Sequence, residues 1–302
     1  MNHSVKIYGT LDAEKVVDQF RVVLDNINKL NQTSLEVEID ITELNFVKPS
    51  AISMLYNITK WINDNNYTFY FKLPEINREN KVLTYLDDSQ IFKITTGRSI
   101  FEDSRVRNTT LPLKNLKISS TEEWVSTTFN YWFSYQIGCE VTRLANLQSL
   151  LLELFNNTRD HSDKDYCCTY SQHYPNRKKI EISISDFGVG IPNNVKKRAP
   201  HIQSDSQRIE EALKRGFTTK TNPHNRGEGL YILNEYIVED GIGSLMIISG
   251  NGIYKVDSSG KVVKNTLKCT YPGTFISIEI DTRKVERILT DDFSDEGVEL
   301  EW

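Results

Sequence analysis

The sequence has no run that approaches the roughly 20 apolar residues of a membrane-spanning helix. Residues 1–6 also lack the basic-then-apolar pattern of a secretory signal peptide. No internal repeat and no long low-complexity tract are visible. We therefore expect a cytoplasmic protein with no membrane partner.

Cysteine is scarce, and its spacing argues against two common uses. The four cysteines, at positions 139, 167, 168 and 269, form no C-x-x-C pair, and adjacent cysteines make a poor disulfide or zinc framework. We expect reduced thiols. The net charge of −5 argues against a general affinity for nucleic acid, so we expect no nucleic-acid partner.

The chain is long enough for about two domains, and the apolar pattern predicts an α/β protein. We expect a small α/β domain at 1–95, a helical connector at 96–140, a second domain at 141–282 and an acidic tail at 283–302. In the first domain the predicted strands are 5–8, 35–39 and 67–73, and the predicted helices are 12–29, 50–62 and 81–87.

The connector contains an aromatic-rich segment, 124–137, which predicts a helix. We interpret this helix either as packed between the two domains or as ordinary core, and we expect 108–114 to be a plain connection. In the second domain we expect helices at 141–160 and 229–240, and strands at 179–186, 244–249, 252–256 and 274–280. A short helix is expected within the polar stretch 193–225, with Ser204 as N-cap, Gln207 at N3 and Gly216 at C′.

The first candidate for chemistry is a polar ridge on the predicted helix 141–160. Glu153, Asn157, Asp160 and His161 stand at i, i+4, i+7 and i+8, within about one 100° sector of a helix. Apolar neighbours would bury this helix, and buried carboxylates and amides need partners. Asn157 could offer its carbonyl oxygen to Mg²⁺, and Glu153 could deprotonate a nucleophile. A surface helix with a polar face is the alternative.

The predicted strand 179–186 ends in a second candidate. Asp186 at the strand end could accept a hydrogen bond from the exocyclic amine of adenine, and Gly188 and Gly190 would let the backbone approach the base. Turns use the same residue types, so this motif alone is also compatible with an ordinary turn.

Two further segments suit a nucleotide. Glycines ahead of a helix suit phosphate, because free N–H groups and the helix dipole favour an anion. The residues in question are Thr219, Lys220, Gly227, Glu228, Gly229 and Leu230. Later in the chain, the hydroxyl of Thr274 could hold a water or a ring nitrogen of the base.

These segments together resemble the N, G1, G2 and final Gly-Thr boxes of the GHKL ATPase superfamily, which includes histidine-kinase catalytic domains, anti-sigma-factor serine kinases, Hsp90, gyrase B and MutL. They are Glu-Leu-Phe-Asn-Asn-Thr-Arg-Asp-His at 153–161, Asp-Phe-Gly-Val-Gly at 186–190, Gly-Glu-Gly-Leu at 227–230 and Gly-Thr at 273–274. The resemblance covers 141–282 and implies ATP and Mg²⁺ as cofactors.

The same resemblance implies a Bergerat-type fold, with a mixed sheet under helices and a left-handed βαβ connection. Asn157 would bind Mg²⁺, Glu153 would be the catalytic base and Asp186 would read adenine. The stretch 193–225 would be the mobile ATP lid. The remaining residues expected at the nucleotide are Asp160, His161, Gly188, Gly190, Ile191, Thr219, Lys220, Gly227, Glu228, Gly229, Leu230 and Thr274.

The stretch Val-Glu-Ile-Asp-Ile-Thr-Glu-Leu-Asn-Phe-Val-Lys-Pro-Ser-Ala-Ile at 37–52 resembles the core of a STAS domain, the anti-sigma-factor-antagonist fold. Ser50 falls where that family carries a phosphorylatable serine. The chain departs from the family here, because Lys-Pro-Ser-Ala at 48–51 replaces the usual Asp-Ser-Ser-Gly. An ordinary helix N-cap beside Pro49 is the alternative role for Ser50.

A histidine kinase is not expected, because no histidine precedes the ATPase segment on a plausible helix. A gyrase- or MutL-type enzyme is not expected either, since only about 20 residues follow position 280. An ATPase domain beside a STAS-like domain resembles a partner-switching pair fused in one chain.

Three functions stay open. The leading one is a Ser/Thr protein kinase of the anti-sigma-factor type, acting on Ser50 in cis, or in trans in a homodimer, or on a protein partner. The second is a non-catalytic switch in which ATP changes the partner that is held. The third is Hsp90-like ATP hydrolysis that drives dimer clamping.

Overall fold

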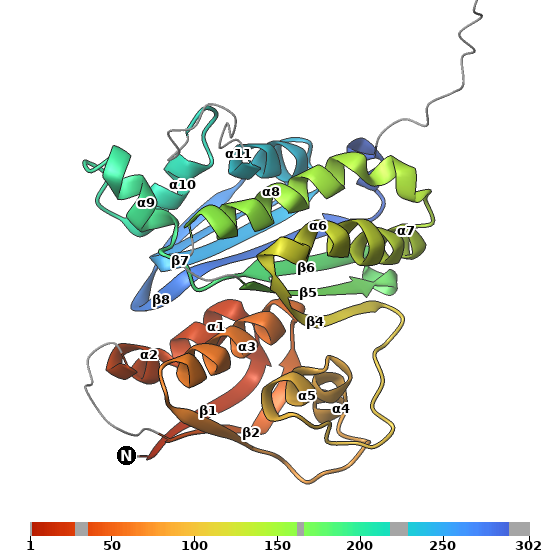
Figure 1. The fold of residues 1–302 in the computed structure, drawn as a ribbon, viewed down its shortest axis with the longest axis vertical. Coiled ribbons are helices and arrows are strands. Elements are labelled where there is room, and N and C mark those ends of the chain that lie inside the picture. Colours follow the sequence, from red (N-terminus) through yellow and green to blue (C-terminus); the bar gives the residue numbers. More distant parts are fainter. Residues whose placement is uncertain (1, 28–35, 162–165, 218–228, 290–302) are drawn as a thin grey trace, which may run out of the picture.

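Figure 1 shows the chain in a computed structural model that describes residues 2–27, 36–161, 166–217 and 229–289. Its strands form one sheet of three strands and one of five. We call residues 2–96 the N-terminal unit and residues 110–289 the C-terminal unit. The chain is therefore an α/β protein with one parallel and one antiparallel sheet.

The N-terminal unit is a parallel sheet with helices between its strands. The strands pair in the order β1-β2-β3. The elements are β1 (Asn2–Leu11), α1 (Ala13–Gln19), α2 (Arg21–Ile27), β2 (Glu36–Val47), α3 (Pro49–Asp64), β3 (Thr68–Lys72), α4 (Lys81–Asp88) and α5 (Ile91–Thr96). Helix α1 begins where the Asp12 side chain accepts a hydrogen bond from the Lys15 N–H, and α3 begins at Pro49, whose fixed φ suits the first helical turn.

The C-terminal unit is an antiparallel sheet in the order β4-β5-β6-β8-β7. Its strands are β4 (Thr110–Lys117), β5 (Tyr166–Tyr174), β6 (Lys179–Ser185), β7 (Gly243–Val256) and β8 (Val262–Asp281). Its α-helices are α6 (Thr121–Trp124), α7 (Asn130–Ile137), α8 (Ala145–His161), α9 (Ile191–Arg198), α10 (Asp205–Ala212) and α11 (Gly229–Asn234). Short 3₁₀ or π turns occur at Ile118–Ser120, Val125–Phe129, Val141–Leu144, Pro175–Arg177, Glu235–Glu239 and Val285–Ile288.

The two faces of the five-stranded sheet are covered by different parts of the chain (Figure 1). On β6, the side chains of Ile180, Ile182 and Ile184 belong to the core that packs under α8. The alternate residues point the other way, where the Ser183 hydroxyl bonds the Ser53 hydroxyl of α3 at 2.6 Å. The N-terminal unit therefore lies on the sheet face opposite α8.

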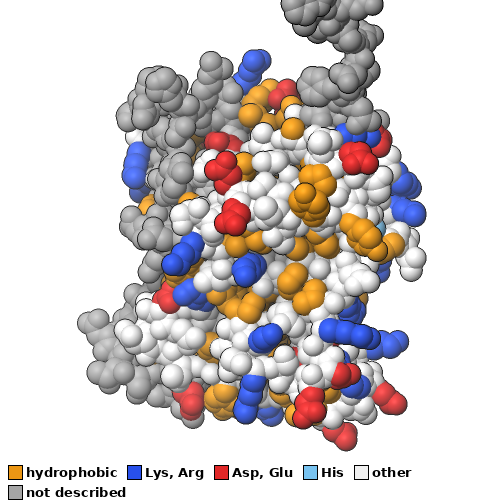
Figure 2. Space-filling model, turned by 45° about the vertical axis from the view of Figure 1, so that its right-hand side comes forward, with side chains coloured by type: hydrophobic (Ala, Val, Ile, Leu, Met, Phe, Trp, Pro, Cys, Tyr) orange, Lys and Arg blue, Asp and Glu red, His pale blue; other side chains and the backbone are white. Residues whose placement is uncertain are grey.

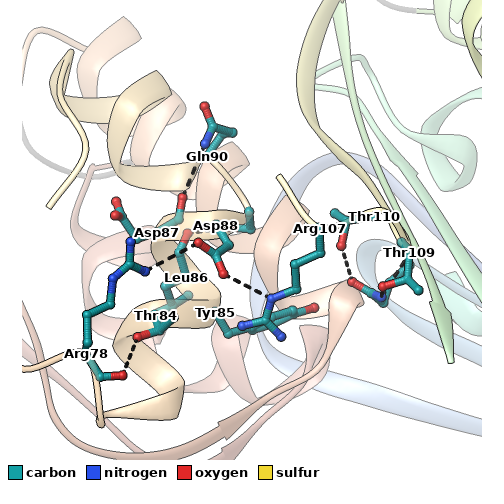
Figure 3. Close-up of polar contacts among 12 residues, drawn as sticks. Arg78, Thr84, Tyr85, Leu86, Asp87, Asp88, Gln90, Arg107, Thr109 and Thr110 are labelled. Carbon is teal, nitrogen blue, oxygen red and sulfur yellow. Dashed lines mark hydrogen bonds and ion pairs between the residues drawn. The ribbon is translucent and has the colours of Figure 1, made fainter. Parts of the chain in front are cut away.

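The connection between the units is held by a polar network (Figure 3). The carboxylate of Asp88, at the end of α4, lies 3.0 Å from Nε of Arg107 and 3.7 Å from a terminal nitrogen of Arg78. Next to Arg107, the Thr110 hydroxyl bonds the Gln172 side chain at 2.6 Å. This network ties the segment before β4 to α4 on one side and to β5 on the other.

Figure 2 shows hydrophobic side chains in small separate groups, with charges of both signs between them. The most exposed large hydrophobic side chains of the described residues are Tyr135 and Tyr131 on α7, at 74% and 63%. Tyrosine tolerates such exposure because its hydroxyl is polar. Within the described residues, every helix is too short or too polar to cross a bilayer.

Several predicted elements agree with the structure. Ser204 caps α10 by accepting a hydrogen bond from the Gln207 N–H at 3.2 Å, as expected. Helix α3 and strands β3 and β6 match the predicted 50–62, 67–73 and 179–186 to within a few residues. Gly216 is not the C′ residue, because α10 ends at Ala212 and two more turns follow it.

Other expectations are wrong. The expected mixed sheet is antiparallel at all four pairings that the structure describes. The plain connection at 108–114 contains the start of β4, strand β5 was not expected, and 244–256 forms one strand, β7. Of the two interpretations of the aromatic helix, packing between the units is wrong and ordinary core is confirmed, since Phe129 and Phe133 lie in the core beside α8.

The crossover from β6 to β7 places α9, α10 and α11 between two strands that run in the same direction, with β8 between them. A βαβ connection is therefore present, although its sheet is antiparallel.

Candidate functional site

The polar ridge of α8 meets the start of α11. Leu154 and Phe155 bury one side of α8 against the sheet, while Glu153 and Asn157 are half-buried on another side. Gly229, the first residue of α11, is buried against them. A Cβ at Gly229 would overlap Cγ of Glu153 and lie 3.1 Å from Nδ2 of Asn157. Only a residue without a side chain lets α11 begin at this distance from the ridge.

Asp186, which directly follows β6, is hydrogen-bonded to Thr274 of β8. The Asp186 side chain is only 8% exposed. Its Oδ1 accepts hydrogen bonds from the N–H groups of Gly188, at 2.5 Å, and Thr274, at 3.2 Å. The Asp186 N–H in turn donates to the Thr274 carbonyl at 2.9 Å. The structure thus brings together Asp186 and Thr274, two residues 88 positions apart.

Ser249 on β7 joins the segments at Ile191 and at Gly273–Thr274, and it was not expected from the sequence. Its hydroxyl donates to the Gly273 carbonyl at 2.7 Å, accepts from the Ile191 N–H at 3.0 Å and lies 3.2 Å from the Thr274 hydroxyl. The residue is fully buried. A single serine in a predicted strand gives no sequence signal for this role, because the contacts all come from distant segments.

Two glycines make the close approach possible. Gly190 has φ +81°, and a Cβ there would lie 2.9 Å from the Ser249 hydroxyl. Gly273 has φ +97°, and a Cβ there would lie 2.7 Å from Cα of Phe187. Both the left-handed backbone and the lack of space require glycine.

Ile191 and Leu230 connect the group around the ridge of α8 with the group around Asp186 and Ser249. Ile191 is the first residue of α9, and Leu230 is the second residue of α11. Both pack against the core under α8 and against the small cluster of Val195, Ala199 and Ala212. The starts of α9 and α11 therefore lie at the same end of the helix layer.

Some expected site residues cannot be placed. Thr219, Lys220, Gly227 and Glu228 lie outside the described residues, as does part of the expected lid at 193–225. Asp160 and His161 belong to the last turn of α8, and their side chains also lie outside the described part.

The metal expectation rests on Asn157. The described residues contain no group of three or more His, Cys, Asp or Glu side chains that could hold a metal ion. An amide oxygen beside a helix start does not make a metal site built from protein side chains alone. It fits a site in which Mg²⁺ takes most of its ligands from phosphates and water. Gly229, the first residue of α11, lies directly beside the Asn157 amide, so this amide stands at the helix start.

Ser50 lies far from this ridge in the fold, on the opposite face of the sheet. It is the second residue of α3 and is 3% exposed. Its N–H donates to Oε1 of Glu181 on β6 at 2.8 Å. Burial raises the pKa of Glu181, and the hydrogen bonds from Ser50 oppose that shift. The alternative role of Ser50 as N-cap is wrong, because Lys48 is the N-cap residue and makes no side-chain cap.

Comparison of the chain with protein-family models and with curated proteins found no match.

Proposed function

We propose that the C-terminal unit is a GHKL-type ATPase domain with a Bergerat fold that binds ATP with Mg²⁺, and that the N-terminal unit is a STAS-like domain. The main support for the ATPase assignment is the contact of Gly229 with Glu153 and Asn157, because it joins the segment that resembles the G2 box to the helix that resembles the N box. The parallel order β1-β2-β3, with α3 directly after β2, supports the STAS-like assignment.

Each proposed role has a local physical reason. The Asp186 carboxylate is held by two backbone N–H groups, which orients it for the exocyclic amine of adenine. Asn157 supplies an oxygen to Mg²⁺. Glu153, one helical turn earlier, orients or deprotonates the attacking hydroxyl or water. Catalysis of phosphoryl transfer then comes from positioning and electrostatic stabilisation.

The position of Ser50 favours a second candidate function, the ATP-gated switch. Ser50 is buried under the sheet, whereas Glu153 lies above it. The five-stranded sheet separates donor from acceptor, so this arrangement does not permit transfer to Ser50 within one chain. A kinase activity would therefore act on Ser50 only after the units separate, or on another protein.

Incubation with γ-labelled ATP and Mg²⁺ distinguishes the proposals. Label on protein indicates the kinase, free phosphate indicates hydrolysis, and binding without turnover indicates the switch. Glu153→Ala should abolish the first two and leave binding intact, whereas Asp186→Asn should weaken binding. Absence of saturable ATP binding by the wild-type chain would overturn the nucleotide proposal as a whole.

A further inference from the structure

The long hairpin of β7 and β8 starts at the candidate site and extends beyond the sheet. Its register shifts on either side of Gly250, directly after Ser249. A bulge at this place bends the strand and redirects the outer part of the hairpin. This outer part, from Gly250 to Tyr271, pairs only with itself among the described strands.

One face of the hairpin contacts α10. The Asp205 carboxylate accepts a hydrogen bond from the Asn251 N–H at 2.9 Å, and Glu210 pairs with Lys264 at 2.8 Å. A Cβ at Gly252 would lie 2.5 Å from the N of Ser206, so the start of α10 lies directly on the hairpin backbone.

The other face contacts the N-terminal unit. Lys255 pairs with Glu14 of α1, and the Cys269 thiol lies 3.7 Å from the Val17 carbonyl. At the base of the hairpin, the Tyr271 hydroxyl bonds Asn57 of α3 at 2.9 Å. Hydrophobic side chains of the hairpin share one core with those of α1, α2 and α3.

The contact between α3 and the sheet is polar where β6 takes part in it. Besides the Ser53–Ser183 pair, this face of the sheet buries Ser185 and Ser277. The Ser277 hydroxyl lies 3.3 Å from the Glu181 carboxylate. Hydroxyls regain water on exposure, so separating such a surface costs less free energy than separating an all-apolar one.

We propose that the β7–β8 hairpin couples the nucleotide site to the docking of the N-terminal unit. Ile191 bonds Ser249 at the root of the hairpin, and α9 and α10 connect the same loop to its outer part. Nucleotide that fixes the Asp186–Ile191 segment biases the position of the hairpin, and the hairpin holds α1 and α3. By linkage, docking changes ATP affinity by the same factor by which ATP changes docking. This inference rests on the proposed ATP site.

A reversible lock tests the coupling. The 2.6 Å separation of the Ser53 and Ser183 hydroxyls suits a disulfide in the double variant Ser53→Cys, Ser183→Cys. The single variants are the controls. ATP affinity, measured with Mg²⁺ by calorimetry on the full chain, should differ between the oxidised and reduced double variant by about 5-fold or more. The difference should disappear when Asp205→Ala is added, and persist with Asp103→Ala, which lies away from the hairpin.

The outcomes separate the two proposals. Wild-type chain that fails to bind ATP overturns the proposed function. ATP that binds the oxidised and reduced double variant equally well overturns the coupling and leaves the ATP site standing. Cross-links that form between chains rather than within one also overturn it, because they place α3 on another molecule.

A measurement on the wild-type chain avoids dependence on the double variant. ATP with Mg²⁺ should change amide hydrogen exchange in α3 and in β6, at the contact of Ser53 with Ser183. Unchanged exchange there, with ATP bound, overturns the coupling.

Discussion

Removing the Glu181 carboxylate tests how the two units are joined. The Lys48 side chain forms no cap at the start of α3. The Glu181 carboxylate, on β6 of the five-stranded sheet, caps this helix instead by accepting a hydrogen bond from the Ser50 N–H. In Glu181→Ala, the buried Ser50 N–H loses its acceptor. The Ser277 hydroxyl, 3.3 Å from the same oxygen, loses one as well.

The magnitude depends on the burial of the donor. A buried N–H left without a partner costs ~1–3 kcal/mol, and loss of a helix cap costs ~0.5–2 kcal/mol. Alanine also removes a carboxylate whose burial disfavours its charged form, which offsets part of the loss. We expect a net loss of about 1–2 kcal/mol, which lowers Tm by roughly 2–8 °C in a protein of this size.

The pH dependence gives a second readout, through Glu181→Gln. Glutamine keeps an oxygen for the Ser50 N–H but cannot ionise. Because the pKa of Glu181 is raised in the folded chain, its stabilising contribution is present below the ordinary value of 4.5 and is lost as pH rises through the folded pKa. The wild-type chain should therefore gain stability relative to Glu181→Gln as the pH falls toward 4.5.

Thermal unfolding by calorimetry at several pH values measures both effects. Glu279→Ala is the matched control, because Glu279 lies on the neighbouring strand in a partly exposed pair with Lys179, and such pairs contribute about 0–1 kcal/mol. If Glu181→Ala unfolds at the same temperature as Glu279→Ala near neutral pH, the cap across the two units has no energetic weight and the reasoning is refuted.

Three further perturbations address the site and the N-terminal sheet. Gly229→Ala should weaken ATP binding at least tenfold, because the new Cβ overlaps Glu153; unchanged affinity in a nucleotide titration would contradict the contact. Ser249→Ala should lower stability by about 1–3 kcal/mol and weaken ATP binding, since it leaves buried backbone groups unpaired; denaturant unfolding checks the first effect. Hydrogen bonds from Lys72 and Thr42 lower the pKa of Asp40 to about 2, so Lys72→Met should raise it. An NMR titration of Asp40 that shows the same pKa in both chains would contradict the role of Lys72. A lowered pKa stabilises the fold above the ordinary value of 3.8 and ceases to do so as pH falls toward 2, so Lys72→Met should reduce the loss of stability over that range.

Local chemistry explains what the sequence could predict. The cap of α10 depends on Ser204 and Gln207 alone, and the close approach at the expected G2-like segment depends on a glycine at 229. Such features depend on a few adjacent residues, so residue propensities and motif spacing are enough to predict them.

Non-local contacts explain the failures. Strand β4 pairs with the distant β5, where Thr110 lies beside Gln172, 62 positions later. The pattern of β4 itself carries a proline and two lysines, so nothing local marks it as a strand. The role of Ser249 depends on segments near 190 and 273. The alternation of β6 indicates one polar face, but it does not indicate that the N-terminal unit covers that face.

The core that α1 and α3 share with Tyr170, Tyr271 and Phe275 has a consequence for cutting the chain. Because these apolar groups come from both units, neither half can be excised near residue 95 without exposing the interior of the other. Heating should accordingly melt the two sheets in one calorimetric event, and a fragment ending at the connection should aggregate or remain partly unfolded.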